Sequence, residues 1–466
     1  MAHPPQRDDR TPPPWSRGPV RSAVRGLVAP VERFLAIQTA SGILLLLAAA
    51  LALAWANSPW RESYTALWET PIGIRLGALA FERSLGWWIN DGLMVIFFFV
   101  VGLEIRREIH AGELSDLRRA ALPLAAALGG MVLPALIYSG FNRGLPTLDG
   151  WGIPMATDIA FAVGVLTLLG KRVPPALRIL LLALAVIDDL GAILVIALFY
   201  SSGIQLVGML VMASGVLGVL GMQWSGVRSP WAYVLPTLAV WGGAYAGGIH
   251  PTLAGVFVGM LTPVQAWYAG ESFLARATQH IESFRRAKDG HARLVELDRL
   301  GLASLEAVAP VERLQHRLHG LVAFAIMPIF ALANAGVTLG SAEFGGDGMR
   351  VFLGVVFGLI VGKLIGIFSF SWLAVRLGLA ALPTGVSWKG VAIVALVGGI
   401  GFTMSLFIAG LALPAGPMLE TAKLAILCGS FAAAIVALVI GALVLKPGLP
   451  AGAARTAGEA ERSTTS

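Results

Sequence analysis

Two adjacent carboxylates, Asp188 and Asp189, lie in the middle of a long apolar run, residues 183–197. A charge near the centre of a bilayer costs at least ~2.5–3.5 kcal/mol. Such a pair therefore persists only where it faces water or a counter-charge, or where it holds a proton or a cation. Carboxylate oxygens are hard ligands that suit an alkali-metal ion, and neighbouring carboxylates titrate as a coupled pair. Asp188 and Asp189 are predicted to bind protons and a metal cation in competition, and a helix end at the membrane surface is the disfavoured alternative.

Three further polar residues, Thr157, Asp158 and Lys363, also lie inside apolar segments. Thr157 and Asp158 are expected either to supply oxygens to the cation or to face the positive N-termini of half-helices; the alternative is an ordinary helix N-cap. An ammonium group within an apolar segment needs an anionic partner. Asp188, Asp189 or free backbone carbonyls are the candidates for Lys363, and the alternative is that its side chain extends to the membrane surface.

Four titratable residues are candidates for sensing pH: Glu104, Glu108, His250 and His316. Histidine changes charge near neutral pH, and Glu104 and Glu108 lie among arginines where an apolar segment ends. The alternative for the two glutamates is a set of solvated ion pairs, and a lone histidine is more often structural. Asp91, near the start of the same apolar segment, is expected to be an interfacial helix cap.

The composition indicates a polytopic membrane protein, since 56% of the 466 residues are hydrophobic and only 13% are charged. A soluble domain has about 25% charged residues, and a membrane-spanning helix needs roughly 20 apolar residues. About twelve such segments are centred near residues 47, 98, 130, 160, 189, 212, 238, 257, 329, 364, 399 and 432. The sequence therefore predicts an all-α fold of about twelve transmembrane helices. Its single cysteine rules out a disulfide framework or a cysteine metal cluster.

The arginines and lysines alternate between loops as the positive-inside rule predicts, with both termini in the cytoplasm. The net charge of +7 reflects this distribution and does not indicate nucleic-acid binding. We expect residues 1–31 and 447–466 to be disordered cytoplasmic tails that flank a transporter domain at 32–446. Residues 1–31 lack the apolar core of a signal peptide. The stretch 264–317 is rich in arginine and is expected to be a cytoplasmic loop.

Two of the predicted spans contain helix-breaking residues. The fourth span, Trp151 to Leu169, opens with Gly152 and Pro154, and the eleventh span, Val391 to Leu411, contains the run Gly-Gly-Ile-Gly. Backbone groups freed inside a membrane must contact protein or line a cavity. Paired interrupted spans in the two halves of a transporter are typical of a binding site at mid-membrane.

The polar motifs of the chain, taken together and in order, resemble the NhaA family of sodium/proton antiporters over about residues 32–445. These motifs are Asn90-Asp91-Gly92-Leu93-Met94, Val101-Gly102-Leu103-Glu104-Ile105, Ala156-Thr157-Asp158-Ile159-Ala160-Phe161-Ala162, Val186-Ile187-Asp188-Asp189-Leu190-Gly191, Ala331-Leu332-Ala333-Asn334-Ala335-Gly336-Val337, Gly362-Lys363 and Gly399-Ile400-Gly401-Phe402-Thr403-Met404-Ser405. The chain departs from the family at Gln315, where the family carries an acidic residue tied to pH sensing.

For the fold and the site, the resemblance implies inverted repeats whose two broken helices cross at mid-membrane. It implies that Asp189 is the main ligand of the transported Na⁺, with Asp188 beside it and paired with Lys363 when no ion is bound. Thr157 and Asp158 would assist at the crossing, where Asp158 balances the positive helix ends and Lys363 the negative ones.

For the activity, the resemblance implies an electrogenic antiporter that exports Na⁺ or Li⁺ in exchange for protons and is regulated by pH. It implies a multi-pass protein of the bacterial inner membrane that needs no cofactor. A homodimer would form through residues 58–86. Two alternatives remain from the residues alone: a Mg²⁺-dependent membrane enzyme acting on a phosphorylated lipid, and a passive cation channel.

Overall fold

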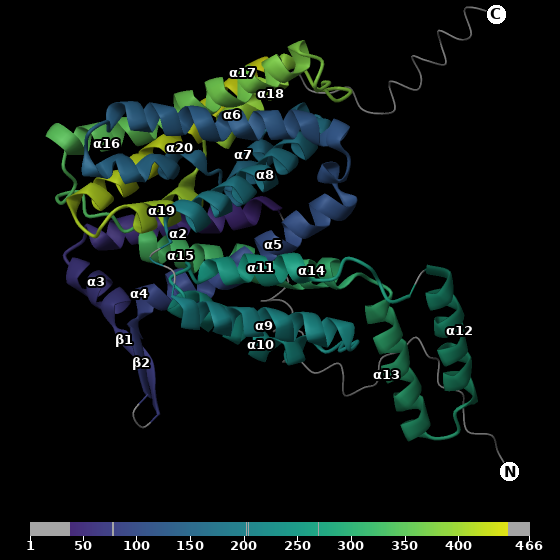
Figure 1. The fold of residues 1–466 in the computed structure, drawn as a ribbon. Helices are drawn as coiled ribbons and strands as arrows, with labels where there is room; N and C mark the ends of the chain where they lie inside the picture. The colour runs from purple at the N-terminus through teal and green to yellow at the C-terminus, as the bar shows by residue number, and fades with distance from the viewer. Residues whose placement is uncertain (1–37, 77–78, 202, 204, 269, 446–466) are drawn as a thin grey trace, which may run out of the picture.

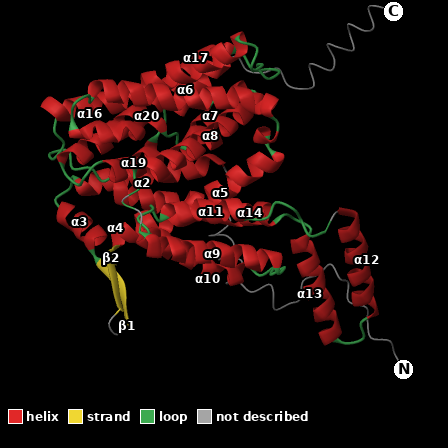
Figure 2. Ribbon diagram, viewed as in Figure 1, coloured by secondary structure: helices red, strands yellow, loops and turns green. Residues whose placement is uncertain are grey.

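The computed structural model describes residues 38–445, apart from residues 77–78, 202, 204 and 269. The predicted tails at 1–31 and 447–466 lie outside these residues. Helices make up most of the described chain, and one strand pair stands out from them (Figure 2). The predicted class, a mostly helical membrane protein, is confirmed, and the strand pair is an addition that the sequence pattern did not predict.

The helices that correspond to the twelve predicted segments follow one another in chain order. They are α2 (Gln38–Ala56); α4 (Leu85–Trp87), η2 (Trp88–Leu93) and α5 (Met94–Ala111); α6 (Leu117–Phe141); η4 (Pro146–Met155) and α7 (Ile159–Leu168); α8 (Pro175–Phe199); α9 (Leu206–Trp224); α10 (Val234–Ala246); α11 (Thr252–Leu261); α14 (Pro310–Leu321), η7 (Val322–Ile326) and α15 (Met327–Asn334); α16 (Gly346–Phe357), η8 (Gly358–Gly362) and α17 (Lys363–Arg376); α18 (Trp388–Gly398) and α19 (Phe402–Ala412); and α20 (Pro417–Val444). Short 3-10 segments connect some of them: η3 (Glu113–Ser115), η5 (Gly170–Arg172) and η6 (Pro230–Tyr233).

Within the described chain, seven continuous helical runs are long and apolar enough to cross a membrane. Of the twelve predicted centres, only the one near residue 399 falls outside a helix, because it lies at the break between α18 and α19. Helix α2 meets the same criterion only together with α3 (Arg61–Glu69), from which it is bent by 114°. Helices α10 and α11 are shorter than a full span.

The fourth and eleventh spans are broken, as predicted. Helix pair η4 and α7 is bent by 45°, and α18 and α19 are bent by 46°. The first break follows Pro154, and the second falls at Gly399 to Gly401, where glycine weakens the helix.

The broken spans belong to two three-span units, α6 to α8 and α16 to α20. The last span of each unit packs against the broken span of the other, since α8 contacts α18 and α20 contacts α7. The first spans, α6 and α17, pack closely at Gly129 and Gly366, where a Cβ on Gly129 would lie 2.1 Å from the Gly366 carbonyl oxygen. Small residues at a helix contact allow this approach in membranes, and it brings Lys363 at the start of α17 into the interior.

Two structured segments lie between the predicted membrane spans. Residues 58–86 form α3 and an antiparallel hairpin of β1 (Pro71–Leu76) and β2 (Leu79–Ser84). The predicted loop at 264–317 contains α12 (Gly270–Arg286) and α13 (Gly290–Glu306), and its last residues already belong to α14. Both additions project from the bundle beside α9 and α10, at its opposite ends (Figure 1). Their polar composition favoured the loop interpretation, although Asp289 caps α13 by accepting the Ala292 amide at 2.7 Å.

Candidate functional site

The breaks of the two interrupted spans are hydrogen-bonded to each other. The amide of Asp158 donates to the carbonyl of Ile400 at 2.7 Å. The Thr157 hydroxyl donates to the carbonyl of Gly398 at 2.8 Å, and the Ser405 hydroxyl donates to the carbonyl of Ile153 at 2.7 Å. Backbone groups that the breaks release from their helices are therefore paired within the protein, as an apolar environment requires.

Asp158 connects the N-termini of both half-helices that follow the breaks. Its Oδ1 accepts the Phe161 amide at 3.0 Å at the start of α7. Its Oδ2 accepts the Thr403 amide at 3.1 Å and the Thr403 hydroxyl at 2.5 Å at the start of α19. A carboxylate there offsets the positive ends of two helix dipoles. Asp158 therefore caps a helix and also faces the N-termini of two half-helices. Thr403 was not predicted as part of the site.

Lys363 lies in the interior with 1% of its surface exposed, so its side chain does not reach the membrane surface. Its Nζ donates to Asp188 Oδ2 at 2.6 Å and to Thr157 Oγ1 at 3.0 Å. Since Thr157 in turn donates to Gly398 at the end of α18, the lysine charge is linked to the negative end of that half-helix. The π-helical segment η8 directly precedes Lys363, and such segments are frequent at functional sites.

The two central carboxylates, Asp188 and Asp189, lie on α8 and are each 2% exposed. Neither faces lipid. The Oδ1 atom of each has no hydrogen-bond partner in the part of the chain that the structure describes. Leaving a polar atom buried without a partner is costly, so each of these two oxygens would gain a bond from a proton or a small cation. Asp189 is also close enough to interact electrostatically with Glu104 on the neighbouring α5.

The other candidate pH sensors lie away from this centre. Glu108 forms an ion pair with Arg107 at 3.1 Å and accepts the Glu113 amide at 3.1 Å, near the end of α5. Gln315 on α14 accepts from the same Arg107 at 3.0 Å. His316, the next residue of α14, is exposed to solvent.

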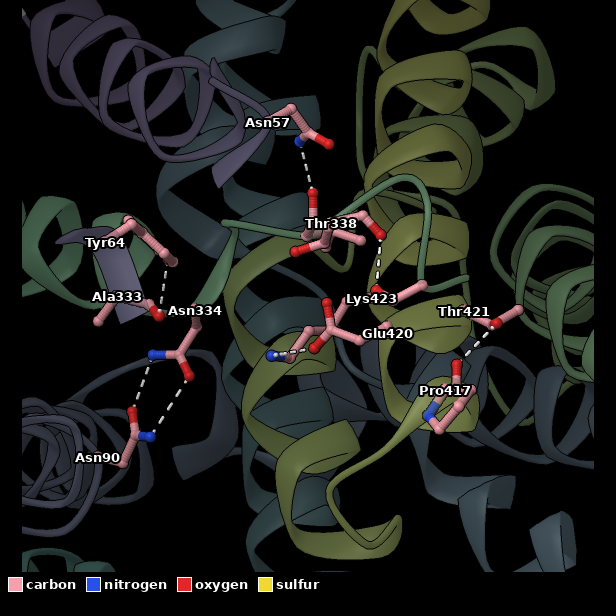
Figure 3. Close-up of polar contacts among 12 residues, drawn as sticks. Asn57, Tyr64, Asn90, Ala333, Asn334, Thr338, Pro417, Glu420, Thr421 and Lys423 are labelled. Atoms are coloured by element: carbon pink, nitrogen blue, oxygen red, sulfur yellow. Dashed lines mark hydrogen bonds and ion pairs between the residues drawn. The ribbon is translucent and has the colours of Figure 1, made fainter. Parts of the chain in front are cut away.

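A separate polar cluster lies at the other end of the second span. Asn90 and Asn334 exchange two hydrogen bonds, at 2.8 and 3.3 Å, between η2 and α15 (Figure 3). Asp91 lies within η2 with its carboxylate 3.4 Å from His250 Nε2, so its prediction as an interfacial cap was wrong. These residues line a small cavity of about 110 Å³ together with Phe407. His250 is therefore not part of the Asp188–Asp189 centre.

Known proteins resemble this chain over nearly its whole length. The sequence profile of a family described as Na+/H+ antiporter 1 matches residues 32–441. An Na(+)/H(+) antiporter NhaA 2 of Sorangium cellulosum is 57% identical over 462 residues, which cover 98% of this chain and 99% of the relative. An Na(+)/H(+) antiporter NhaA 2 of Myxococcus xanthus is 55% identical over 456 residues, covering 97% of each. Among solved structures, the sodium proton antiporter MjNhaP1 of Methanocaldococcus jannaschii aligns with 91% of this chain and 97% of its own, at 14% identity and a TM-score of 0.42, a similarity that supports no further conclusion.

Proposed function

This chain belongs to the Na⁺/H⁺ antiporter 1 family and is a secondary transporter rather than an enzyme. We therefore propose that it exchanges Na⁺ or Li⁺ for protons at Asp188 and Asp189. The observation that carries this assignment is the unpartnered Oδ1 atom on each of these two buried carboxylates. An oxygen without a partner in a dry interior gains most from binding a proton or a cation.

In the proposed cycle, a cation and protons compete for the same two carboxylates. Asp189 is the first ligand, because no charged side chain among the described residues is bonded to it, whereas Asp188 is held by Lys363 at 2.6 Å. Cation binding draws Asp188 away from Lys363, and Asp188 then becomes the second carboxylate ligand of the ion. Release on the other side of the membrane lets protons reload both carboxylates. Asp188 pairs with Lys363 again once it has given up its proton on the cytoplasmic side.

The crossing of the broken spans is proposed as the frame around which this site changes its access. The Asp158 carboxylate offsets the positive ends of both half-helices, and it accepts hydrogen bonds from the Phe161 and Thr403 amides there. Thr157 would contribute an oxygen, and its hydroxyl lies between the Lys363 Nζ and the carbonyl of Gly398, which supports this role.

Finer features are part of the same proposal. Exchange is electrogenic, with more protons entering than cations leaving. It is regulated by pH through Glu104, Glu108, His250 and His316, and it needs no resident cofactor. The protein would lie in a bacterial inner membrane with both termini cytoplasmic, which the distribution of arginines supports.

The proposed homodimer would use the β1–β2 hairpin in residues 58–86. The position of the hairpin outside the bundle, beside α9 and α10, supports this placement (Figure 1). A cysteine in place of exposed Ile72 should allow crosslinking between two copies in the membrane.

The deciding experiment is transport by the purified protein in liposomes that carry a pH gradient and a fluorescent pH probe. Adding Na⁺ or Li⁺ should change the fluorescence of the pH probe, because the added cation is exchanged for protons. Adding K⁺ should not change it. A passive channel would instead collapse a cation gradient without moving protons. A Mg²⁺-dependent lipid enzyme would show no exchange at all.

A further inference from the structure

The helical hairpin of α12 and α13 lies outside the helix bundle, and the ion-exchange site does not use it. Figure 1 shows both helices running across the direction of α9, α11 and α14, at one end of these helices. Helix α9 and the run that begins with α14 are long and apolar enough to cross a membrane. A helix pair that runs across them at their ends therefore lies along the membrane surface and does not pass through it.

The hairpin has a defined inner side. Glu296 of α13 is hydrogen-bonded to His280 Nδ1 of α12 at 2.8 Å and forms an ion pair with Arg299 at 2.9 Å. The guanidinium of Arg293 lies 5.9 Å from the ring centre of Phe284 on α12. The side of α13 that carries Glu296 therefore faces α12.

Four leucines of α13 are exposed, Leu294, Leu297, Leu302 and Leu305, at 61%, 48%, 59% and 37%. We define Leu294, Leu297 and Leu305 as the apolar stripe, and the exposed carboxylate of Asp298 borders it. Residues on a helix are about 100° apart, so Leu294 points about 200° away from Glu296 and hence away from α12. In Figure 1, α13 lies nearer to α9 than α12 does. The stripe thus faces the side on which a bilayer around α9 and α10 would continue. Rows of exposed apolar residues of this kind mark an interaction surface.

The end of the hairpin far from the bundle carries a basic tip, which we define as Arg285, Arg286, Lys288 and Arg293. All four side chains are exposed, and Asp289 is the one acidic residue among them. Glu282 pairs with Arg286 of the tip itself, and Glu296 and Glu306 pair with Arg299 and Arg228. Asp298 is exposed farther along α13, away from the tip. The tip therefore has a net positive charge that complements anionic headgroups.

The base of the hairpin is fixed to the bundle. Arg228, in the loop after α9, pairs with Glu306 and stacks 4.4 Å from the ring centre of Trp267. Arg313 of α14 donates to the carbonyl of Leu305 at 2.6 Å. These contacts hold the two ends of the hairpin beside the ends of α9 and α14, so its apolar stripe cannot rotate freely.

We propose that the α12–α13 hairpin docks on the anionic lipid surface beside the transporter, with the apolar stripe at the acyl boundary and the basic tip among the headgroups. An amphipathic helix binds at this depth when a polar, basic face accompanies an apolar one. Juxtamembrane arginines and lysines add attraction to anionic lipids.

The test uses the full-length protein with Cys428→Ser, in nanodiscs of phosphatidylglycerol or of phosphatidylcholine. One variant carries Leu297→Cys and the other Thr278→Cys, which lies on α12 about 200° from His280 and so faces away from α13. Each is labelled with an environment-sensitive fluorophore, and quenching by doxyl-labelled phospholipid is measured. We expect strong quenching at position 297 and little at position 278 in phosphatidylglycerol. Adding Arg285→Gln and Arg286→Gln should weaken docking roughly fivefold per removed charge.

Two outcomes would overturn the proposal. A label at position 297 that is not quenched and emits as in water would mean that the hairpin stands free in solvent. A label that is shielded but not quenched by lipid, and that crosslinks to position 297 of a second copy, would mean that the stripe is a contact between copies. Ion exchange by the Thr278→Cys variant serves as the check that the labelled protein is folded.

Discussion

Asp158 and the Asp188–Asp189 pair are buried carboxylates in neighbouring broken and unbroken spans, yet their surroundings differ in kind. Asp158 accepts hydrogen bonds from Phe161 and Thr403 on both of its oxygens. Asp188 has one oxygen bound to Lys363 and one without a partner, and Asp189 has an oxygen with no partner in the described chain. Burial alone therefore does not identify an ion ligand. In our proposal the ion ligand is instead the carboxylate with an unsatisfied oxygen, because that oxygen gains a bond when a cation arrives.

The largest expected effect is at Asp189. Asp189→Asn removes the charge of the free carboxylate, and Na⁺-driven proton movement in liposomes should fall more than roughly 100-fold. This exceeds the 10- to 100-fold loss that follows from removing a group that only supports a metal ligand. The same substitution at Asp158 is the matched control and should retain measurable exchange. Equal losses at both positions would erase the distinction between ligand and cap.

The second-largest effect is expected at Lys363, on the free energy of unfolding. Lys363→Met leaves the charge of Asp188 buried without a partner, and breaking a buried pair in this way costs about 3–5 kcal/mol. The free energy of unfolding in detergent would measure it, with Lys423→Met as the control, since the Lys423–Glu420 pair at 3.1 Å is partly exposed and should contribute only ~0–1 kcal/mol. Adding Asp188→Asn to Lys363→Met should restore part of the loss. A cost no greater than that of Lys423→Met would contradict the role of Lys363 as a buried counter-charge.

A smaller effect is expected at Thr403, on the cap side of the comparison. Thr403→Val removes the hydroxyl that donates to Asp158 at 2.5 Å but keeps the amide. Losing one donor to a buried charged group should lower the free energy of unfolding by about 1–3 kcal/mol, while the apparent affinity for Na⁺ changes little. Thr262→Val is the control, because its hydroxyl bonds only a backbone carbonyl of its own helix. A large drop in Na⁺ affinity with unchanged stability would move Thr403 from the cap to the ion site.

The smallest effect concerns a carboxylate outside the membrane spans. The hydrogen bond from His280, and then the charge of Arg299, lower the pKa of Glu296. Because this pKa is lower in the folded hairpin, the contribution of the carboxylate to stability is present above the ordinary glutamate value of about 4.3. It is lost as the pH falls through the lower folded-state pKa. Amide exchange of α12 and α13 should differ between wild type and Glu296→Gln near neutral pH, and the difference should shrink in acid. A constant difference across this range would show that the pair does not stabilise the hairpin.

Much of the fold could be predicted because bilayer thickness imposes a repeating length on apolar segments. Eleven of the twelve predicted centres fall in helices, and the two breaks fall where Pro154 and Gly399 to Gly401 weaken the backbone. The structured hairpins at 71–84 and 270–306 could not be predicted in the same way. The bilayer sets no length for polar segments outside it, so the sequence pattern does not distinguish a helix or strand there from a loop.

The sequence is enough to find the charged residues inside apolar segments, because such charges are too costly to occur without a use. It therefore pointed to Asp158, Asp188, Asp189 and Lys363 without any coordinates. The different partners of these charges follow from the folded structure. The partner of each oxygen is set by contacts between spans that lie far apart along the chain, such as Lys363 with Asp188 and Thr403 with Asp158. Spacing along one helix cannot report those contacts, since they depend on how two broken spans cross.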